Sequence, residues 1–197
     1  AAISASTGVI GGMQKAINSS SVKKHQVEDA AILDAFHKKY QDKTSMTFDI
    51  NADGIIGEYR KHLEKAILEV IGENRSYILE GGQDAFVPAY FRAQVLDKVN
   101  EAMKGRISGV VTNRSSDLIN GDSAPDIVLE GSPLAEKVIA LVEAGESNAV
   151  NEIVSGHYMR YSPMKLKASC VACHARNGVK QQEGAFGGAL VVDVKLQ

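Results

Sequence analysis

The chain has 197 residues, of which 44% are hydrophobic, and its 22 Lys and Arg against 24 Asp and Glu give a net charge of −2. This balance argues against a nucleic-acid-binding protein, which would carry a basic excess or a basic face. The apolar content suffices for a folded core and is too high for a disordered chain. No stretch approaches the roughly 18 consecutive apolar residues of a transmembrane helix, so we expect no membrane span.

Residues 1–14 are uncharged, small and rich in Gly and Ser, and are typical of a mature or trimmed chain rather than of an intact signal peptide. Farther on, apolar residues recur at three- and four-residue steps and predict helices over residues 27–40 and about 56–79. Gly81 and Gly82 end the second helix. Its near-heptad seam favours an antiparallel helical hairpin or, alternatively, a homodimer. The seam consists of Tyr59, Leu63, Ala66, Val70 and Tyr77.

A segment between these two helices matches the first eight places of an EF-hand loop. Its candidate calcium ligands are Asp49, Asn51, Asp53 and the backbone carbonyl of Ile55. The twelfth place, where an EF-hand has a bidentate Glu, is Arg60, which is a cation. Two interpretations therefore stay open: a weak calcium site, or an Asx-type turn that begins the second helix.

The middle of the chain mixes helical and strand patterns. Pro88 begins a helix that runs to about Met103, and residues 106–112 form a strand rich in β-branched residues. Residues 113–132 have turn-like composition, and Ser132-Pro133 caps a further helix that ends at Gly145. The expected buried stripe of the Pro88 helix is Phe91, Val95, Val99 and Ala102.

Two short strands, residues 151–154 and 157–161, are expected to pair around Ser155-Gly156. A last strand follows Gly187-Gly188, with Asp193 and Lys195 turned away from its apolar face. That apolar face consists of Leu190, Val192, Val194 and Leu196. Helices followed by a mixed part predict an α+β protein with an antiparallel sheet. We place the domain boundary between an N-terminal helical extension, residues 1–84, and a second domain, residues 85–197.

The chain has two cysteines, Cys170 and Cys173, and His174 follows directly. This C-x-x-C-H pattern is that of c-type haem attachment. Each thiol adds across one vinyl group of the haem, and two intervening residues in a tight turn give the required separation. The next residue, His174, then reaches the iron as proximal ligand. The sequence therefore predicts one covalent haem c.

Three other interpretations of the cysteines fit less well. They are a structural disulfide, a thioredoxin-like redox pair and a zinc site. A thioredoxin-like pair begins a helix after a strand of a βαβ unit, and these flanks do not have that pattern. A zinc site needs four ligands, and the sequence has no H-x₃₋₅-H pair to complete one.

Residues 88–194 resemble the family of exported single c-haem domains with a PAS-like fold, found as soluble proteins and as sensor modules of membrane kinases. The resemblance lies in Pro88-Ala89-Tyr90-Phe91, in residues 116–126 with Glu130, in Tyr161-Ser162-Pro163 before the haem motif, and in residues 184–189. In the middle stretch, Gly121 stands for the family's usual Pro and Ser123 for its usual Asn.

This resemblance implies a PAS-like sheet with haem wedged against it, His174 as proximal ligand, and a periplasmic or otherwise exported location. Some members of the family place a cysteine on the distal side of the iron. Both cysteines of this chain are consumed by attachment, so that ligation does not carry over. The distal candidates are His157 and Met159, which share a strand face with Tyr161, and Met103.

We therefore expect an exported haem protein without catalysis of its own. One hypothesis is a redox or diatomic-gas sensor, in which a change at the iron alters a helical contact. The alternative is an electron-transfer cytochrome c that passes single electrons between periplasmic partner proteins. A strong sixth ligand would favour the carrier. An open sixth position in an apolar pocket, which we predict, favours the sensor.

Overall fold

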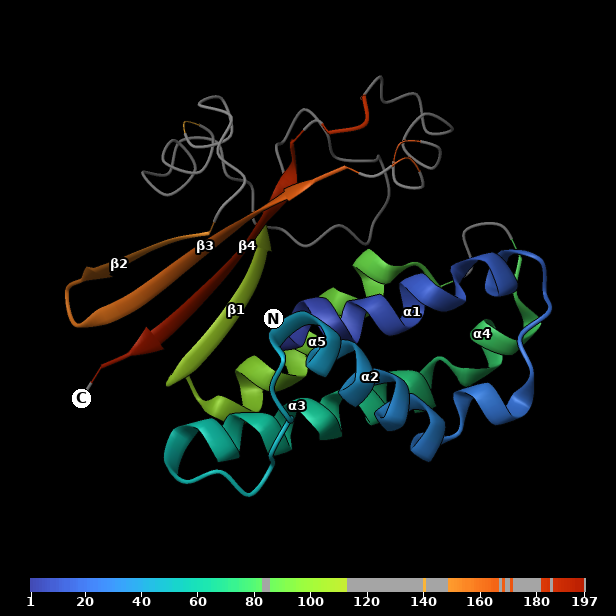
Figure 1. Cartoon of the computed structure of the whole chain (residues 1–197), viewed down its shortest axis with the longest axis horizontal. Helices are drawn as coiled ribbons and strands as arrows, with labels where there is room; N and C mark the ends of the chain where they lie inside the picture. The colour runs from blue at the N-terminus through green and yellow to red at the C-terminus, as the bar shows by residue number, and fades with distance from the viewer. Residues whose placement is uncertain are drawn as a thin grey trace. The chain divides into compact units, whose positions relative to one another are not determined.

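A computed structural model of the chain describes residues 1–82, 86–112, 140, 149–166, 168, 171, 182–184 and 186–196. The chain divides into two compact units, a helical unit, Ala1–Lys104, and a sheet unit, Gly105–Gln197. The protein is α+β, as expected, with helices in the first unit and an antiparallel sheet in the second (Figure 1). The predicted turn and helix over residues 113–145 lie outside the described residues, apart from Ala140.

The helical unit contains five α-helices and one short 3₁₀ helix in its described part. Two of the predicted helices, over residues 27–40 and from Pro88, are confirmed and correspond to α2 and α5. The elements are α1 (Ala2–Asn18), η1 (Lys24–Val27), α2 (Asp29–Thr44), α3 (Gly54–Glu73), α4 (Arg75–Glu80) and α5 (Pro88–Met103).

The core of the helical unit forms where α1 packs on α2 and α5, and where α3 packs on α5. Apolar residues spaced by three and four along each helix form this core, as expected for helices that bury one face. The helical partner of the α3 seam is therefore α5 of the same chain. The largest fully buried side chains of this unit are Phe36, Phe91, Ile10, Ile17, Ile32, Leu63, Ile67, Ile71, Ile78, Met103 and Val27.

The expected helix over residues 56–79 is interrupted at Asn74. Its side-chain amide donates hydrogen bonds to the carbonyl of Val70, at 2.8 Å, and to Oε1 of Gln94, at 2.9 Å. The break changes which residues face inward, so Tyr77 is 63% exposed and Ile78 is buried. The prediction that Tyr77 belongs to the buried seam is therefore wrong.

The end of α5 shows a smaller difference. Ala102 is half-buried, and Met103 takes the innermost place with no exposed surface. Since α5 packs on α1 and α3, the helical unit extends to Lys104, whereas the sequence placed a boundary near residue 84. Periodicity identified α5 but carried no information on which unit it joins.

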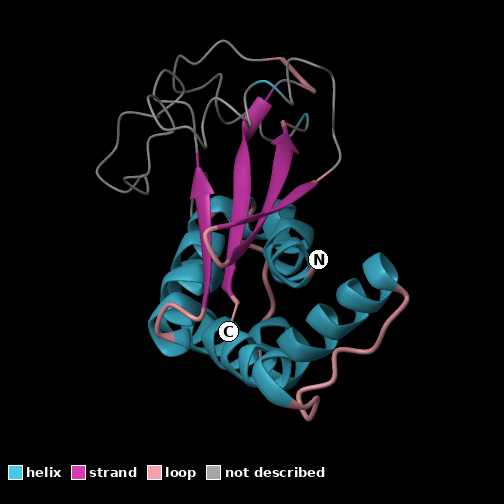
Figure 2. Ribbon diagram, turned by 90° about the vertical axis from the view of Figure 1, so that its left-hand side faces the viewer, coloured by secondary structure: helices cyan, strands magenta, loops and turns pink. Residues whose placement is uncertain are grey.

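The sheet unit has four described strands in the order β1-β4-β3-β2, all antiparallel (Figure 2). Strands β2 and β3 form the predicted hairpin. Its two turn residues, Ser155 and Gly156, have φ of +50° and +78°, as a two-residue hairpin turn of matching twist requires. The strands are β1 (Ile107–Thr112), β2 (Val150–Val154), β3 (His157–Lys165) and β4 (Phe186–Lys195).

The two faces of β4 differ from the expectation. Ala189 and Val191 are buried, whereas Val192 and Val194 are only half-buried and Leu196 is exposed. The prediction that the even-numbered residues share one face, opposite Asp193 and Lys195, is confirmed, but the buried residues Ala189 and Val191 lie on the other face. Alternation alone could not choose the face, because apolar residues occupy both sides of this strand.

Candidate functional site

The predicted haem ligands Cys170, Cys173 and His174 lie outside the described residues, but the structure fixes where their segment joins the sheet. The chain leaves β3 after Lys165, and Lys165 pairs with Phe186 at the start of β4. The backbone N–H of Gly184 donates a 2.9 Å hydrogen bond to the carbonyl of Leu166. The haem motif therefore lies in a segment whose two ends are tied together at one end of the sheet.

The other long segment of the sheet unit begins at this same end. Thr112, the last residue of β1, pairs with Ala189 of β4. Residues 113–139, which include the stretch that carries the family resemblance, follow directly from it. We call this the motif end of the sheet, and the end that carries the Ser155-Gly156 turn is the turn end. The stretch itself, residues 116–126 with Glu130, lies outside the described residues.

One sheet face is apolar and buried at the motif end. Tyr161 pairs directly with Val191, so their side chains share a face, and they are 3% and 4% exposed. Ala189 on the same face is fully buried, and Leu166 just beyond β3 is buried as well. An apolar wall at the end of the sheet where the haem-motif segment joins would suit a flat macrocycle that must be shielded from water. The two thiols and the imidazole also form the donor set that covalent haem needs.

Tyr161 joins this wall to a polar group on β2. Its hydroxyl donates a 2.6 Å hydrogen bond to Oε1 of Glu152. Burial raises the pKa of the Tyr161 phenol above its ordinary value, and the hydrogen bond and negative charge of Glu152 raise it further. The phenol therefore stays protonated and remains a donor over the physiological pH range.

A second polar pair lies on the same face toward the turn end. Nδ1 of His157 lies 2.8 Å from Oδ1 and 3.1 Å from Oδ2 of Asp193. A carboxylate in this position accepts a hydrogen bond from Nδ1 and orients the ring, which leaves Nε2 for any other partner. The sequence correctly placed His157 and Met159 on one face with Tyr161, but gave no sign of the pairing with Asp193, because that pairing depends on strand register.

The three candidate distal ligands do not gather at the motif end. His157 lies eight residues from Lys165 along an antiparallel strand, which corresponds to about 26 Å. Met159 is also on the distant half of β3, and Met103 is fully buried in the helical unit.

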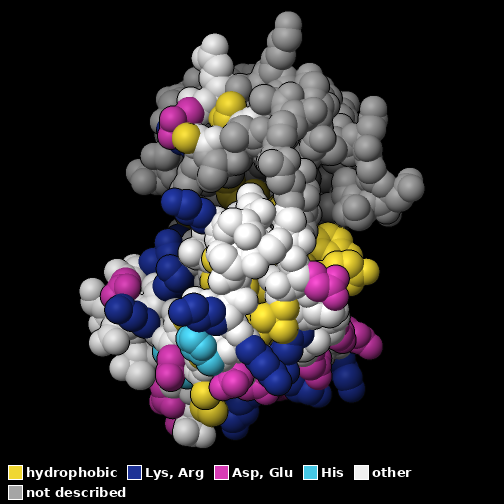
Figure 3. Space-filling view, turned by 90° about the vertical axis from the view of Figure 1, so that its right-hand side faces the viewer, with side chains coloured by type: hydrophobic (Ala, Val, Ile, Leu, Met, Phe, Trp, Pro, Cys, Tyr) yellow, Lys and Arg dark blue, Asp and Glu magenta, His cyan; other side chains and the backbone are white. Residues whose placement is uncertain are grey.

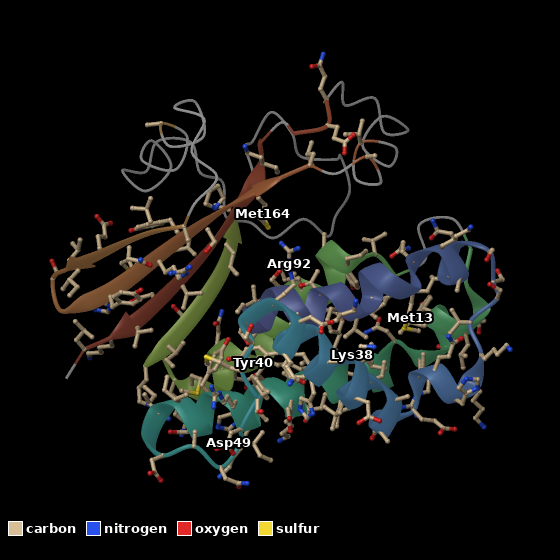
Figure 4. All side chains as sticks on the ribbon, viewed as in Figure 1. Met13, Lys38, Tyr40, Asp49, Arg92 and Met164 are labelled. Atoms are coloured by element: carbon tan, nitrogen blue, oxygen red, sulfur yellow. The ribbon has the colours of Figure 1, made fainter. Side chains whose placement is uncertain are left out.

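One methionine was not singled out as a distal candidate by the sequence. Met164 lies at the motif end of β3, one residue before the strand ends (Figure 4). Strand direction was the signal that could have identified it, because a residue late in β3 is close along the chain to the haem motif.

The EF-hand-like segment adopts an Asx turn. Oδ1 of Asp49 accepts a 2.8 Å hydrogen bond from the backbone N–H of Asn51, and Arg60 donates a 2.9 Å hydrogen bond to the carbonyl of Asp49 (Figure 4). Helix α3 already begins at Gly54, so the carbonyl of Ile55 lies in the first helical turn and accepts within it. A cation therefore contacts the backbone of the first residue of the loop, and the turn interpretation is favoured over calcium.

Charges on the described surface are mixed. On the face drawn in Figure 3, Lys and Arg side chains are interspersed with Asp and Glu. Some form pairs between helices, such as Lys98 with Glu73 at 2.7 Å and Arg75 with Asp29 at 2.9 Å. This agrees with the balanced composition of the chain.

Comparisons with known proteins found no match to any protein-family model, curated protein or solved structure. In the part of the chain that the structure describes, no helix is both long and apolar enough to cross a bilayer.

Proposed function

We propose that the protein is an exported c-type haem protein that binds a diatomic gas or responds to the redox state of its iron. One haem c is attached through Cys170 and Cys173, with His174 as proximal ligand. When bound, the haem supplies the iron at which a gas or an electron is taken up. The chain supplies the tethers, the proximal imidazole and the apolar wall of Tyr161, Ala189 and Val191, which excludes water.

One observation in particular supports a ligand-binding role over electron transfer. His157 and Met159 lie toward the turn end of β3, and Met103 is packed in the core of the other unit. Neither strand residue lies at the motif end, where the haem segment joins the sheet, and this supports an open or weakly ligated sixth position. A haem with an open or weakly ligated sixth position binds diatomic gases, whereas electron carriers hold both axial positions with side chains.

Covalent attachment is tested by expressing the chain in a host that attaches haem to C-x-x-C-H motifs. Haem stain should stay with the polypeptide on a denaturing gel, and Cys170→Ala or Cys173→Ala should weaken it. Met13→Leu, a change in the helical unit, serves as the control and should leave the stain intact. A mass that corresponds only to the chain without haem would contradict the proposal.

The sixth position is tested by the ferrous spectrum with and without carbon monoxide. We expect a rapid carbon monoxide adduct in the parent protein and in His157→Gln, Met159→Leu and Met103→Leu. A low-spin ferrous spectrum that carbon monoxide does not change would favour the electron carrier. Met164→Leu then identifies the ligand, because loss of a Met164–iron bond would open the site to carbon monoxide.

A further inference from the structure

Strand β2 forms one edge of the described sheet. The strand order places β3 on its inner side, and the described part of the chain places no strand on its outer side (Figure 1). Natural sheets protect such edges with Lys, Pro, bulges or covering segments, since an open edge can pair with another chain. β2 contains no Lys, Arg or Pro.

The backbone groups that face outward from β2 follow from the hairpin. A two-residue turn makes its flanking residues, Val154 and His157, a hydrogen-bonded pair. Pairs alternate along an antiparallel ladder, so Asn151 and Ile153 direct their backbone N–H and C=O groups away from β3. These two residues therefore provide the hydrogen-bonding positions of the free edge.

Two apolar side chains of this strand are exposed. Ile153 is 70% exposed and Val154 is 48% exposed. The one charged residue of the strand, Glu152, has its carboxylate turned inward to the hydroxyl of Tyr161. Neither a charge nor a proline of β2 itself thus opposes the approach of a second strand.

We propose that the β2 edge pairs with the β2 edge of a second copy of the chain, antiparallel and with its two-fold axis at Ile153. An axis at Glu152 would place two carboxylates opposite each other, which is destabilising. An axis at Ile153 instead makes Ile153 and its copy a hydrogen-bonded pair and sets Val154 beside Glu152 of the second copy. This register covers both exposed apolar side chains and leaves no like charges opposed.

The paired segment is short, so the interface belongs to the weak end of the range for protein–protein contacts. We expect the mass by sedimentation equilibrium to rise from one chain toward two between about 10 µM and 1 mM. The inference does not depend on haem, so a Cys170→Ser and Cys173→Ser chain should associate to the same extent if it is folded.

Ile153→Lys should keep the protein monomeric at 1 mM, with unchanged far-ultraviolet circular dichroism as evidence of folding. The matched control is Tyr77→Lys, which places the same charge on an equally exposed apolar position of the helical unit and should leave association intact. A parent protein that stays monomeric at 1 mM would overturn the proposal, as would a dimer that persists in Ile153→Lys or is lost instead in Tyr77→Lys.

Cross-linking tests the register. Hydrogen-bonded antiparallel partners have Cα atoms about 5.5 Å apart, within the range that a disulfide spans. In a Cys170→Ser and Cys173→Ser background, which retains neither of the chain's two thiols, Ile153→Cys should form an intermolecular disulfide on oxidation and Tyr77→Cys should not. Equal cross-linking of the two variants would mean random collision and would contradict the register.

Discussion

The helical unit and the sheet unit differ in what their buried surfaces contain. The helical core consists mainly of aliphatic and aromatic side chains at helical spacing, with Ser6 and Thr7 as buried polar residues and α5 as the shared partner of α1 and α3. The described sheet face is mixed, with an apolar wall at the motif end and the pairs Tyr161–Glu152 and His157–Asp193 beyond it. Both the predicted haem attachment and the polar pairs on the sheet face belong to the second unit.

This difference indicates a division of roles. A largely apolar core is stabilised by area and packing, and it tolerates little loss of volume. A sheet face that holds carboxylates, a phenol and an imidazole has specific hydrogen bonds whose loss leaves charged groups unpaired. We therefore expect substitutions in the first unit to change stability most, and substitutions in the second to change stability less and chemistry more.

The largest expected effect is in the helical core. Phe36 is fully buried, and its ring contacts Phe48 edge-on at 4.7 Å between centroids and Tyr40 at 6.5 Å. Phe36→Ala should lower the free energy of unfolding by about 3 to 5 kcal/mol, measured by urea denaturation and circular dichroism. Tyr77→Ala, at an exposed position, is the control and should change it by less than about 0.5 kcal/mol. A loss below about 1 kcal/mol in Phe36→Ala would contradict the described core.

The sequence predicted this unit well for a physical reason. Each helix carries its buried stripe in its own spacing, so Phe91, Val95 and Val99 could be identified without knowledge of the partner helix. The predicted buried stripe is wrong after Asn74, because a side-chain contact with Gln94, 20 residues away, interrupts the helix. The interruption turns Tyr77 outward. The spacing of apolar residues along one helix carries no information about such a tertiary contact.

In the sheet unit the sequence predicted the hairpin and the strand face that joins His157, Met159 and Tyr161. It could not predict the polar pairs, since Tyr161 reaches Glu152 and His157 reaches Asp193 only through the register of three strands. The haem motif was identified by residue type and spacing alone, which specify chemistry but not surroundings. The ranking of distal candidates therefore changed once the direction of β3 was known.

The next-largest expected effect tests whether specific hydrogen bonds stabilise the sheet face. Tyr161→Phe removes the donor at 2.6 Å from Glu152 and leaves a carboxylate without that partner. The free energy of unfolding should fall by about 1.5 to 3 kcal/mol, as for hydrogen bonds to charged groups. In Glu152→Gln, whose neutral amide still accepts from the phenol, the loss should be smaller. An equal loss in both variants would mean that packing, not the charged acceptor, is responsible.

A pH-dependent effect belongs to the helical unit. Burial raises the pKa of Tyr59 to about 12. The phenol of the unfolded chain ionises near pH 10, so between about pH 10 and pH 12 the unfolded state loses its proton first and stability falls as pH rises. The expected loss is about 1 to 2 kcal/mol, absent below pH 10. Tyr59→Phe should flatten this slope, whereas an unchanged slope would place the alkaline sensitivity elsewhere.

The smallest expected effect is at the turn between α2 and α3, where the acidic and amide side chains are exposed and Phe48 is buried. Arg60 donates to the carbonyl of Asp49, and its guanidinium carbon lies 5.4 Å from the centroid of the Phe48 ring. An exposed cation–π contact contributes about 0.5 to 1 kcal/mol, so Arg60→Ala should cost no more than about 1 kcal/mol. Phe48 is itself buried, which allows a double-mutant cycle with Phe48→Leu to isolate the contact from the packing of the ring.

The thermal midpoint of the parent protein, with and without calcium, decides the calcium question. If Arg60 contacts the loop in place of a metal ion, millimolar calcium should leave the thermal midpoint of the parent protein unchanged, within about 1 °C. Because a ligand that binds only the folded state raises that midpoint by mass action, a clear upward shift in the parent protein would establish calcium binding by Asp49, Asn51 and Asp53 and overturn the turn interpretation.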